Sequence, residues 1–172
     1  TDGTQAQMTL LRSRVERMSC TIDGLLDYAL SGQTDEPSES VEVAQLLAEV
    51  IDSLSPPPTF CIEIAPMPII TANRLQLFQV FANLIGNGIK HHDRCDGSIH
   101  ISVREHEDLY EFSVADDGVG IAPEQHERIF IIFQAMNPQN RSDSTGIGLA
   151  IVKKIIEAQG GTLWLESEIG KG

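Results

Sequence analysis

Apolar residues recur near the start of the chain at intervals that alternate between three and four positions. They are Met8, Leu11, Val15, Met18, Ile22, Leu25 and Ala29. This spacing keeps the apolar residues on a single stripe of a helix, as at the a and d positions of a coiled coil. It therefore predicts a helix over about residues 5–30. Because the stripe would otherwise expose a long apolar surface, we expect it to pack in a coiled coil or four-helix bundle. Packing onto this chain's own core is the alternative.

The charge balance narrows the possible partners. The 172 residues include 12 basic and 25 acidic ones, which give a net charge of −13. Such a field repels nucleic acid and anionic membrane surfaces, so neither is expected as a main partner. Three cysteines that lie far apart fit neither a disulfide framework nor a zinc site, which favours the cytoplasm. No apolar run is long enough to span a bilayer, although the chain could be the soluble part of a membrane-bound sensor.

The rest of the chain alternates helical and strand patterns after a polar linker over residues 32–40. Apolar residues at helical spacing predict helices over 44–54, 73–91 and 149–158. Alternating patterns predict strands over 41–43, 60–64, 69–70, 99–103, 110–114 and 162–167. Residues 118–146 have no sustained period, which is typical of a lid or binding loop. We therefore expect residues 41–172 to form an α/β domain, a two-layer sandwich of a mixed β-sheet with helices on one face.

The longest of these helices carries an unusual polar stripe. At about 100° per residue its members fall on one narrow face, and they are Gln76, Gln79, Asn83, Asn87 and Lys90. A solvated face is the ordinary alternative, but such a face usually carries charged pairs rather than amides. The amide oxygens of Asn83 and Asn87 suit Mg²⁺, and Lys90 suits a phosphate, so the stripe indicates a nucleotide–metal site. Gly86 and Gly88 would let a ligand or another backbone approach closely.

Two glycine loops follow. In VADDGVGI a strand end leads into a loop, and a hairpin turn is the weaker alternative because no matching strand comes next. A buried Asp116 would accept a hydrogen bond from an exocyclic amine such as that of adenine, while Gly118 and Gly120 would lie against the base. In STGIGLAIVKKI the first free amides of a helix would form an anion site. The loop before that helix contains Thr145, Gly146 and Gly148.

The segment between the two loops carries an apolar motif, ERIFIIF. Its Phe130 and Phe133 are spaced at i, i+3, which predicts an apolar anchor for the lid. Arg141 lies in the polar part of the lid, where contact with a phosphate and simple solvation are both open.

With these motifs in this order, the chain resembles the catalytic ATP-binding domain of sensor histidine kinases, in the GHKL ATPase superfamily. NLIGNGIKHH resembles the N box, DDGVG the first glycine box, IFIIF the F box and STGIGLAIVKKIIEAQGG the second glycine box. LRSRVERMSCTIDGLLDYAL is similar to the second helix of the family's dimerisation domain. The resemblance covers nearly the whole chain and implies a Bergerat-type sandwich that binds ATP with Mg²⁺.

The resemblance also implies roles by position. Asn87 would be the principal Mg²⁺ ligand with Asn83 beside it, and Lys90 near the phosphates would complete the catalytic set. Asp116 would bond the adenine amine, and residues 121–145 would form the ATP lid. The other implied cofactor contacts are His91, Gly118, Gly120, Ile121, Phe133, Arg141, Thr145, Gly146, Ile147, Gly148 and Leu149.

In such kinases the γ-phosphoryl group passes to a histidine on the first dimerisation helix and then to an aspartate of a response regulator. We thus expect a protein histidine kinase that binds ATP or ADP and forms a homodimer through Met8–Ala29. One alternative is another GHKL ATPase, such as an anti-sigma serine kinase. A second alternative is a degenerate dimerising scaffold.

Four features depart from the family. Residues 1–31 supply only the second dimerisation helix, and none of the five histidines lies in an H-box context, so this chain alone is not expected to autophosphorylate. Gly88 replaces the usual alanine, which should loosen the helix end. Asp117 replaces the usual asparagine and adds negative charge near a site for a polyanion. The chain stops at ESEIGKG, where the family continues into a last strand beside the adenine pocket, and this could reduce nucleotide affinity.

Overall fold

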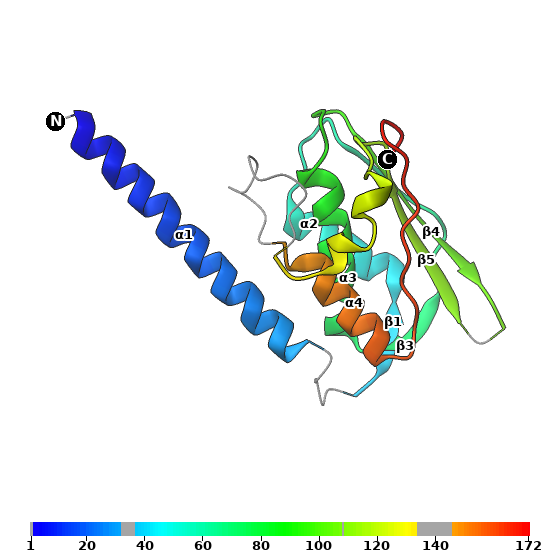
Figure 1. Cartoon of the computed structure of the whole chain (residues 1–172). Helices are drawn as coiled ribbons and strands as arrows, with labels where there is room; N and C mark the ends of the chain where they lie inside the picture. Colours follow the sequence, from blue (N-terminus) through cyan, green and yellow to red (C-terminus); the bar gives the residue numbers. More distant parts are fainter. Residues whose placement is uncertain (1, 32–36, 108, 134–145) are drawn as a thin grey trace.

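The computed structural model describes residues 2–31, 37–107, 109–133 and 146–172. Its first element is α1 (Asp2–Leu30), a long helix that extends away from the rest of the molecule (Figure 1). The expected helix is therefore confirmed. The six larger apolar residues of its stripe, from Met8 to Leu25, are 39–67% exposed, so the stripe does not pack onto the core of its own chain. Within the described part of the chain, no helix combines the length and apolar character needed to cross a membrane.

The elements after α1 follow the expected order, within a few residues at each boundary. The strands are β1 (Glu39–Glu42), β2 (Cys61–Ile64), β3 (Ile69–Ala72), β4 (Ser98–Glu105) and β5 (Tyr110–Asp116). The α-helices are α2 (Val43–Leu54), α3 (Arg74–Lys90) and α4 (Gly148–Ala158), and two short 3₁₀ turns are η1 (Pro123–Gln125) and η2 (Arg128–Phe130). Two boundaries differ: β1 begins inside the expected linker, and Val43 starts a helix instead of ending a strand.

The strands form a mixed sheet, as expected, together with a separate two-stranded one. In the larger sheet β4 pairs with β2 in parallel and with β5 antiparallel, while β1 and β3 form an antiparallel pair. The helices α2, α3 and α4 lie together on one side of β4 and β5 (Figure 1). The expected layers are therefore confirmed, although the strands do not form one continuous sheet.

Helix α3 stands at the centre of the packing. Asn73 caps its first turn, since its side-chain oxygen accepts a hydrogen bond from the Gln76 amide at 2.9 Å. Phe81 and Ile85 belong to the core cluster that α3 shares with α2 and the strands. Val80 belongs to a second cluster, which is formed mainly by residues of α4. Because two faces of α3 are buried in this way, only a narrow polar face remains.

The strand expected over residues 162–167 is wrong. The segment is extended and its residues alternate between exposed and half-buried, but it has no ladder of backbone hydrogen bonds. The segment lines the same cavity as β5 and is paired with none of the strands. A strand needs a neighbouring backbone at about 4.8 Å, and alternation in the sequence does not report whether that neighbour is present.

Lys154 of α4 fastens the end of α1 to the rest of the molecule. Its Nζ atom donates to the backbone oxygens of Tyr28 at 2.5 Å and Ala29 at 3.1 Å, and lies 4.6 Å from the centre of the Tyr28 ring. The last carbonyl groups of a helix lack partners inside the helix and carry partial negative charge. A lysine ammonium group is therefore well suited to hold this helix end.

We predict that Lys154→Met releases α1 from α4, because no cation then binds the helix end. Spin labels on the exposed thiols of Cys20 and Cys61, in a chain where Cys95 is serine, report the distance between the two parts. Lys154→Met should broaden the distance distribution. Lys153→Met should leave it unchanged, because Lys153 pairs only with Glu157 in its own helix. Equal distributions in both variants would contradict the role of Lys154.

Candidate functional site

One cavity of about 680 Å³ collects most of the polar residues singled out in the sequence. Its walls are the C-terminal half of α3, β5 with the loop that follows it, the first turn of α4, and the extended residues 162–167. Ten of the expected site residues line it, namely Asn83, Asn87, Lys90, His91, Asp116, Gly120, Ile121, Gly146, Gly148 and Leu149. The volume lies within the usual range of small-molecule sites.

The two asparagines of α3 have different surroundings. The Asn83 side chain donates to the Gln79 backbone oxygen at 2.8 Å, and its oxygen lies against Gly148, where an added Cβ would come within 2.4 Å. Gly148 therefore lets α4 begin in contact with Asn83. Asn87 lines the cavity one turn further along, next to Lys90 and His91.

The polar stripe of α3 is not uniform. Gln76, its first member, is buried, and its side-chain oxygen accepts a hydrogen bond from Gln159 Nε2 at 2.8 Å. That residue joins α3 to the end of α4 and does not line the cavity. Only the second half of the stripe, from Asn83 to Lys90, reaches the cavity.

The glycines within α3 serve packing. A Cβ on Gly88 would lie 2.9 Å from Ile99 Cδ1 and 3.6 Å from the Asp116 Cβ, so this glycine allows α3 to approach the sheet closely. The helix continues through Gly88 to Lys90, and the loosening expected at Gly88 stays a prediction. Gly86 faces Leu54 of α2 and does not line the cavity, so close approach by a ligand there is wrong.

His91 ends α3 at the edge of the cavity. Partial burial lowers the pKa of His91 below 6.5, the positive charge of Lys90 lowers it further, and the carboxylate of Asp116 opposes both. The ring is therefore neutral at pH 7 and offers one donor and one acceptor nitrogen to the cavity.

The loop after β5 presents a carboxylate and closes against the chain end. Asp116 lines the cavity, but it is exposed, so its expected burial is wrong. Its Oδ1 atom accepts a hydrogen bond from the Gly118 amide at 3.0 Å. Gly118 is buried and does not line the cavity. Gly120 has φ 69°, and an added Cβ would lie 2.1 Å from the Glu168 backbone oxygen, so only glycine fits. The Ile121 amide donates to Ser167 Oγ at 2.7 Å.

The first turn of α4 forms a further wall of the cavity, which lies against Asn83 of α3. Gly146 has φ 66°, and no side chain of the described residues caps the helix. Amides at an uncapped helix start attract anions. Ile147 points the other way, because its side chain is fully buried in the core cluster of Val80. The expected cofactor contact therefore cannot involve the Ile147 side chain.

The expected lid residues are only partly described. Phe130 lines the cavity, whereas Phe133 lies outside it and is half exposed. Phe133 has φ 67°, and its amide donates to the Gly146 backbone oxygen at 3.0 Å. Arg141 and Thr145 lie outside the described residues.

Sequence reasoning missed several residues that line the cavity. Glu111, Ser113, Trp164 and Lys171 are among them. The alternation within β5 could have suggested Glu111 and Ser113. Nothing local marks Trp164 and Lys171, because they enter through the extended segment and the turn at the chain end.

The cavity suits a nucleotide with a divalent cation. Among the described residues, no group of three or more histidine, cysteine, aspartate or glutamate side chains could hold a metal ion. A cation here would therefore depend on amide oxygens and on the phosphates of its ligand, an arrangement that is typical of Mg²⁺. The open amides of α4 and the charge of Lys90 complete a set of donors for phosphate.

Known proteins are similar to this chain in sequence. The chain is 48% identical over 111 residues to the phytochrome-like protein Cph1 of Synechocystis sp.. The matched region covers 64% of this chain and 15% of that protein. It is 34% identical over 176 residues to cyanobacterial phytochrome B of Nostoc sp., covering 99% and 23%. The chain thus spans less than a quarter of either relative.

Solved structures are also similar to this chain. Full-length ShkA in complex with AMPPNP superposes with a TM-score of 0.76 at 27% identity, covering 99% of this chain and 37% of ShkA. The catalytic domain of histidine kinase ThkA, in a nucleotide-free form, gives a TM-score of 0.60 at 28% identity and covers 79% and 97%.

The sequence model of one family, described as the histidine kinase-, DNA gyrase B- and HSP90-like ATPases, matches residues 72–172. That range contains α3, β4, β5, both glycine loops and α4, and so every wall of the cavity. The chain belongs to this family, as a histidine kinase ATPase domain.

Proposed function

We propose that the chain binds Mg–ATP in this cavity and presents the γ-phosphate to a histidine of a dimerisation helix. The main support for the proposal is that three kinds of binding group line one cavity. These are the amide oxygen of Asn87, the uncapped start of α4, and the Asp116 carboxylate. They correspond to a metal, to phosphates and to the exocyclic amine of a base.

Asn87 would hold Mg²⁺ through its side-chain oxygen, and Asn83 would stand beside it. Mg²⁺ usually keeps water and phosphate oxygens in its coordination shell, so one or two protein oxygens suffice. Lys90 and the amides at Gly146–Leu149 would bind the phosphate oxygens. These groups would offset the repulsion that a chain of net charge −13 exerts on a polyanion.

Asp116 would recognise the base. Its Oδ1 atom already accepts the Gly118 amide, while Oδ2 has no hydrogen-bond partner among the described residues and can accept from the adenine amine. Phosphoryl transfer depends mostly on positioning and charge neutralisation. The residues of this cavity therefore supply what such a reaction requires from the protein.

The α1 stripe supports a histidine kinase over other ATPases of the family, because it offers a long unpaired apolar face for a second copy. A response regulator receiver domain would take the phosphoryl group next. ThkA, a fold neighbour at 23% identity with a TM-score of 0.67, was crystallised with the response regulator protein TrrA. The free thiols of Cys20, Cys61 and Cys95 fit the reducing cytoplasm.

We predict that Asn87→Ala lowers Mg²⁺-dependent affinity for ADP by more than about tenfold, because loss of even an outer-shell partner costs about that much in metal affinity. Calorimetric titrations with Mg²⁺ and with a chelator measure the effect. Gln79→Ala is the matched control, since Gln79 is an amide on the same helix outside the cavity. Unchanged binding by Asn87→Ala would remove Asn87 from the site.

We predict that Val15→Glu converts a dimer into a monomer, because it places a charge in the middle of the apolar stripe. Light scattering gives the mass in solution. Arg14→Glu changes the charge of the same turn beside the stripe and should leave the dimer intact. A wild-type chain that is strictly monomeric would contradict the dimer.

A further inference from the structure

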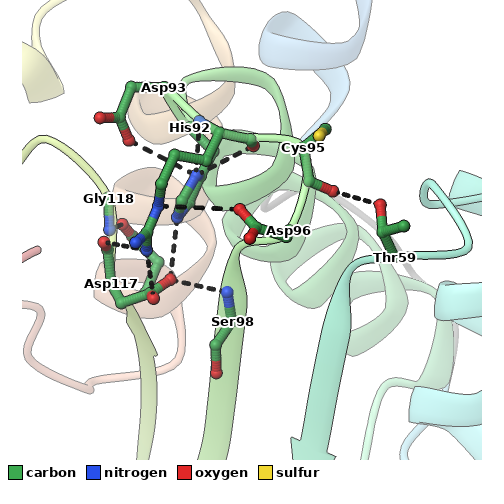
Figure 2. Close-up of polar contacts among 10 residues, drawn as sticks. Thr59, His92, Asp93, Cys95, Asp96, Ser98, Asp117 and Gly118 are labelled. Atoms are coloured by element: carbon green, nitrogen blue, oxygen red, sulfur yellow. Dashed lines mark hydrogen bonds and ion pairs between the residues drawn. The ribbon is translucent and has the colours of Figure 1, made fainter.

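A polar cluster lies just outside the cavity and joins two of its walls. Figure 2 shows His92 and Ser98 beside the carboxylate of Asp117, which Arg94 also binds. None of the four lines the cavity. His92 directly follows Lys90 and His91 at the end of α3, Ser98 begins β4, and Asp117 directly follows Asp116 at the end of β5.

His92 is held in a closed space. Its side chain has no exposed surface, and its ring lies edge-on to Phe60 with 5.3 Å between the ring centres. An added Cβ on Gly97 would lie 2.5 Å from His92 Nε2, so Gly97 leaves room for the imidazole. Nδ1 lies 3.1 Å from both the amide and the backbone oxygen of Arg94, and 3.6 Å from Asp93 Oδ1, so it has donor and acceptor neighbours. Nε2 lies 2.8 Å from Asp117 Oδ1, which can only accept, and therefore carries a proton in this contact.

Asp117 accepts hydrogen bonds from three residues, two in the loop after α3 and one at the start of β4. Its Oδ1 atom accepts from the Ser98 amide at 2.6 Å and from His92 Nε2 at 2.8 Å, and Oδ2 accepts from Arg94 Nη2 at 2.5 Å (Figure 2). The Asp117 amide also donates to the Ser98 backbone oxygen at 3.2 Å. We expected Asp117 to add negative charge near the site. Asp117 does not itself line the cavity, and its carboxylate is paired with Arg94.

We propose that the bond between Asp117 and His92 positions Asp116 for recognition of the base. Asp117, the residue that follows Asp116, is held at two points. Its amide binds the Ser98 backbone oxygen, and its side chain binds His92, Arg94 and the Ser98 amide. The turn fixed in this way carries the Gly118 amide that binds Asp116 Oδ1. Asp117 is thus a positioning residue, which acts on the nucleotide only through its neighbour. The inference rests on the proposed role of Asp116.

The aspartate is needed here because of Arg94. Asparagine, the usual residue at this position in the family, would accept through one oxygen and turn its NH₂ group toward Arg94. Two donors would then face each other at the place where Oδ2 now binds a guanidinium group. Asp117 and Arg94 therefore form a matched pair in this chain.

We predict a pH dependence for this cluster. The Ser98 amide, then the His92 side chain and the Arg94 charge lower the pKa of Asp117 from 3.8 to about 2. Because the folded pKa is the lower one, ionised Asp117 stabilises the fold above pH 3.8, and this contribution disappears as the pH falls toward 2. Urea unfolding of the wild type and of Asp117→Asn should differ at neutral pH and converge in acid. A constant difference would contradict the assignment.

The decisive experiment compares ATP with inosine triphosphate, which carries an oxygen in place of the adenine amine. If Asp117 acts through Asp116, Asp117→Ala should weaken ATP binding by about tenfold, which corresponds to about 1.4 kcal/mol. Binding of inosine triphosphate should change by less than about twofold, because that ligand makes no amine contact. Asp96→Ala is the matched control, since Asp96 lies 4.0 Å from Arg94 but does not bind Ser98 or His92.

A second variant and a second readout keep the test independent of folding. His92→Phe fills the same buried space without a donor and should shift the ratio of the two affinities in the same direction. In nucleotide-free protein, Asp117→Ala should speed amide exchange at Ser98 and Gly118 only. An equal loss for both nucleotides, or an unchanged ratio, would overturn the positioning role. A wild type without preference for ATP would instead remove the proposed role of Asp116, and the positioning role with it.

Discussion

The packing of α3 on two sides is the constraint on which the rest of the structure depends. Phe81 and Ile85 bury one face of the helix in the core cluster that α3 shares with α2 and the strands. Val80 buries another face against α4. The remaining face forms a wall of the cavity. Gly88 sets how closely α3 approaches the sheet, and Gly148 sets how closely α4 begins beside it. The spacing of three of the four walls therefore depends on positions where an added side chain would displace Ile99 or Asn83.

The acidic character of the chain makes the local placement of charge important. A polyanionic ligand would meet an unfavourable overall field and would depend on local groups, for which we propose Lys90 and the open amides of α4. Asp116 lines the cavity, whereas Asp117 does not line it and is paired with Arg94. Two adjacent carboxylates thus have separate surroundings, and only one of them contributes negative charge to the cavity.

Periodicity predicted the elements better than it predicted their partners. Helices α2, α3 and α4 appear where apolar spacing indicated them, because burial of one face is what holds a helix in a folded domain. Residues 162–167 alternate as a strand does, yet they face a cavity and not a neighbouring strand. Gln76 and Asn83 share a stripe, but only Asn83 reaches the cavity, because the end of α4 covers Gln76. Contacts such as His92 with Asp117 join residues 25 positions apart, and no local pattern reveals them.

The central claim is that the cavity beside α3 binds a nucleotide with Mg²⁺. The most direct measurement is an amide NMR titration of the wild-type chain with ADP, with and without Mg²⁺. The account predicts Mg²⁺-dependent shifts at Asn87, at Asp116–Gly120 and at Gly146–Leu149. No shifts at millimolar ADP, or shifts confined to residues outside the cavity walls, would contradict it.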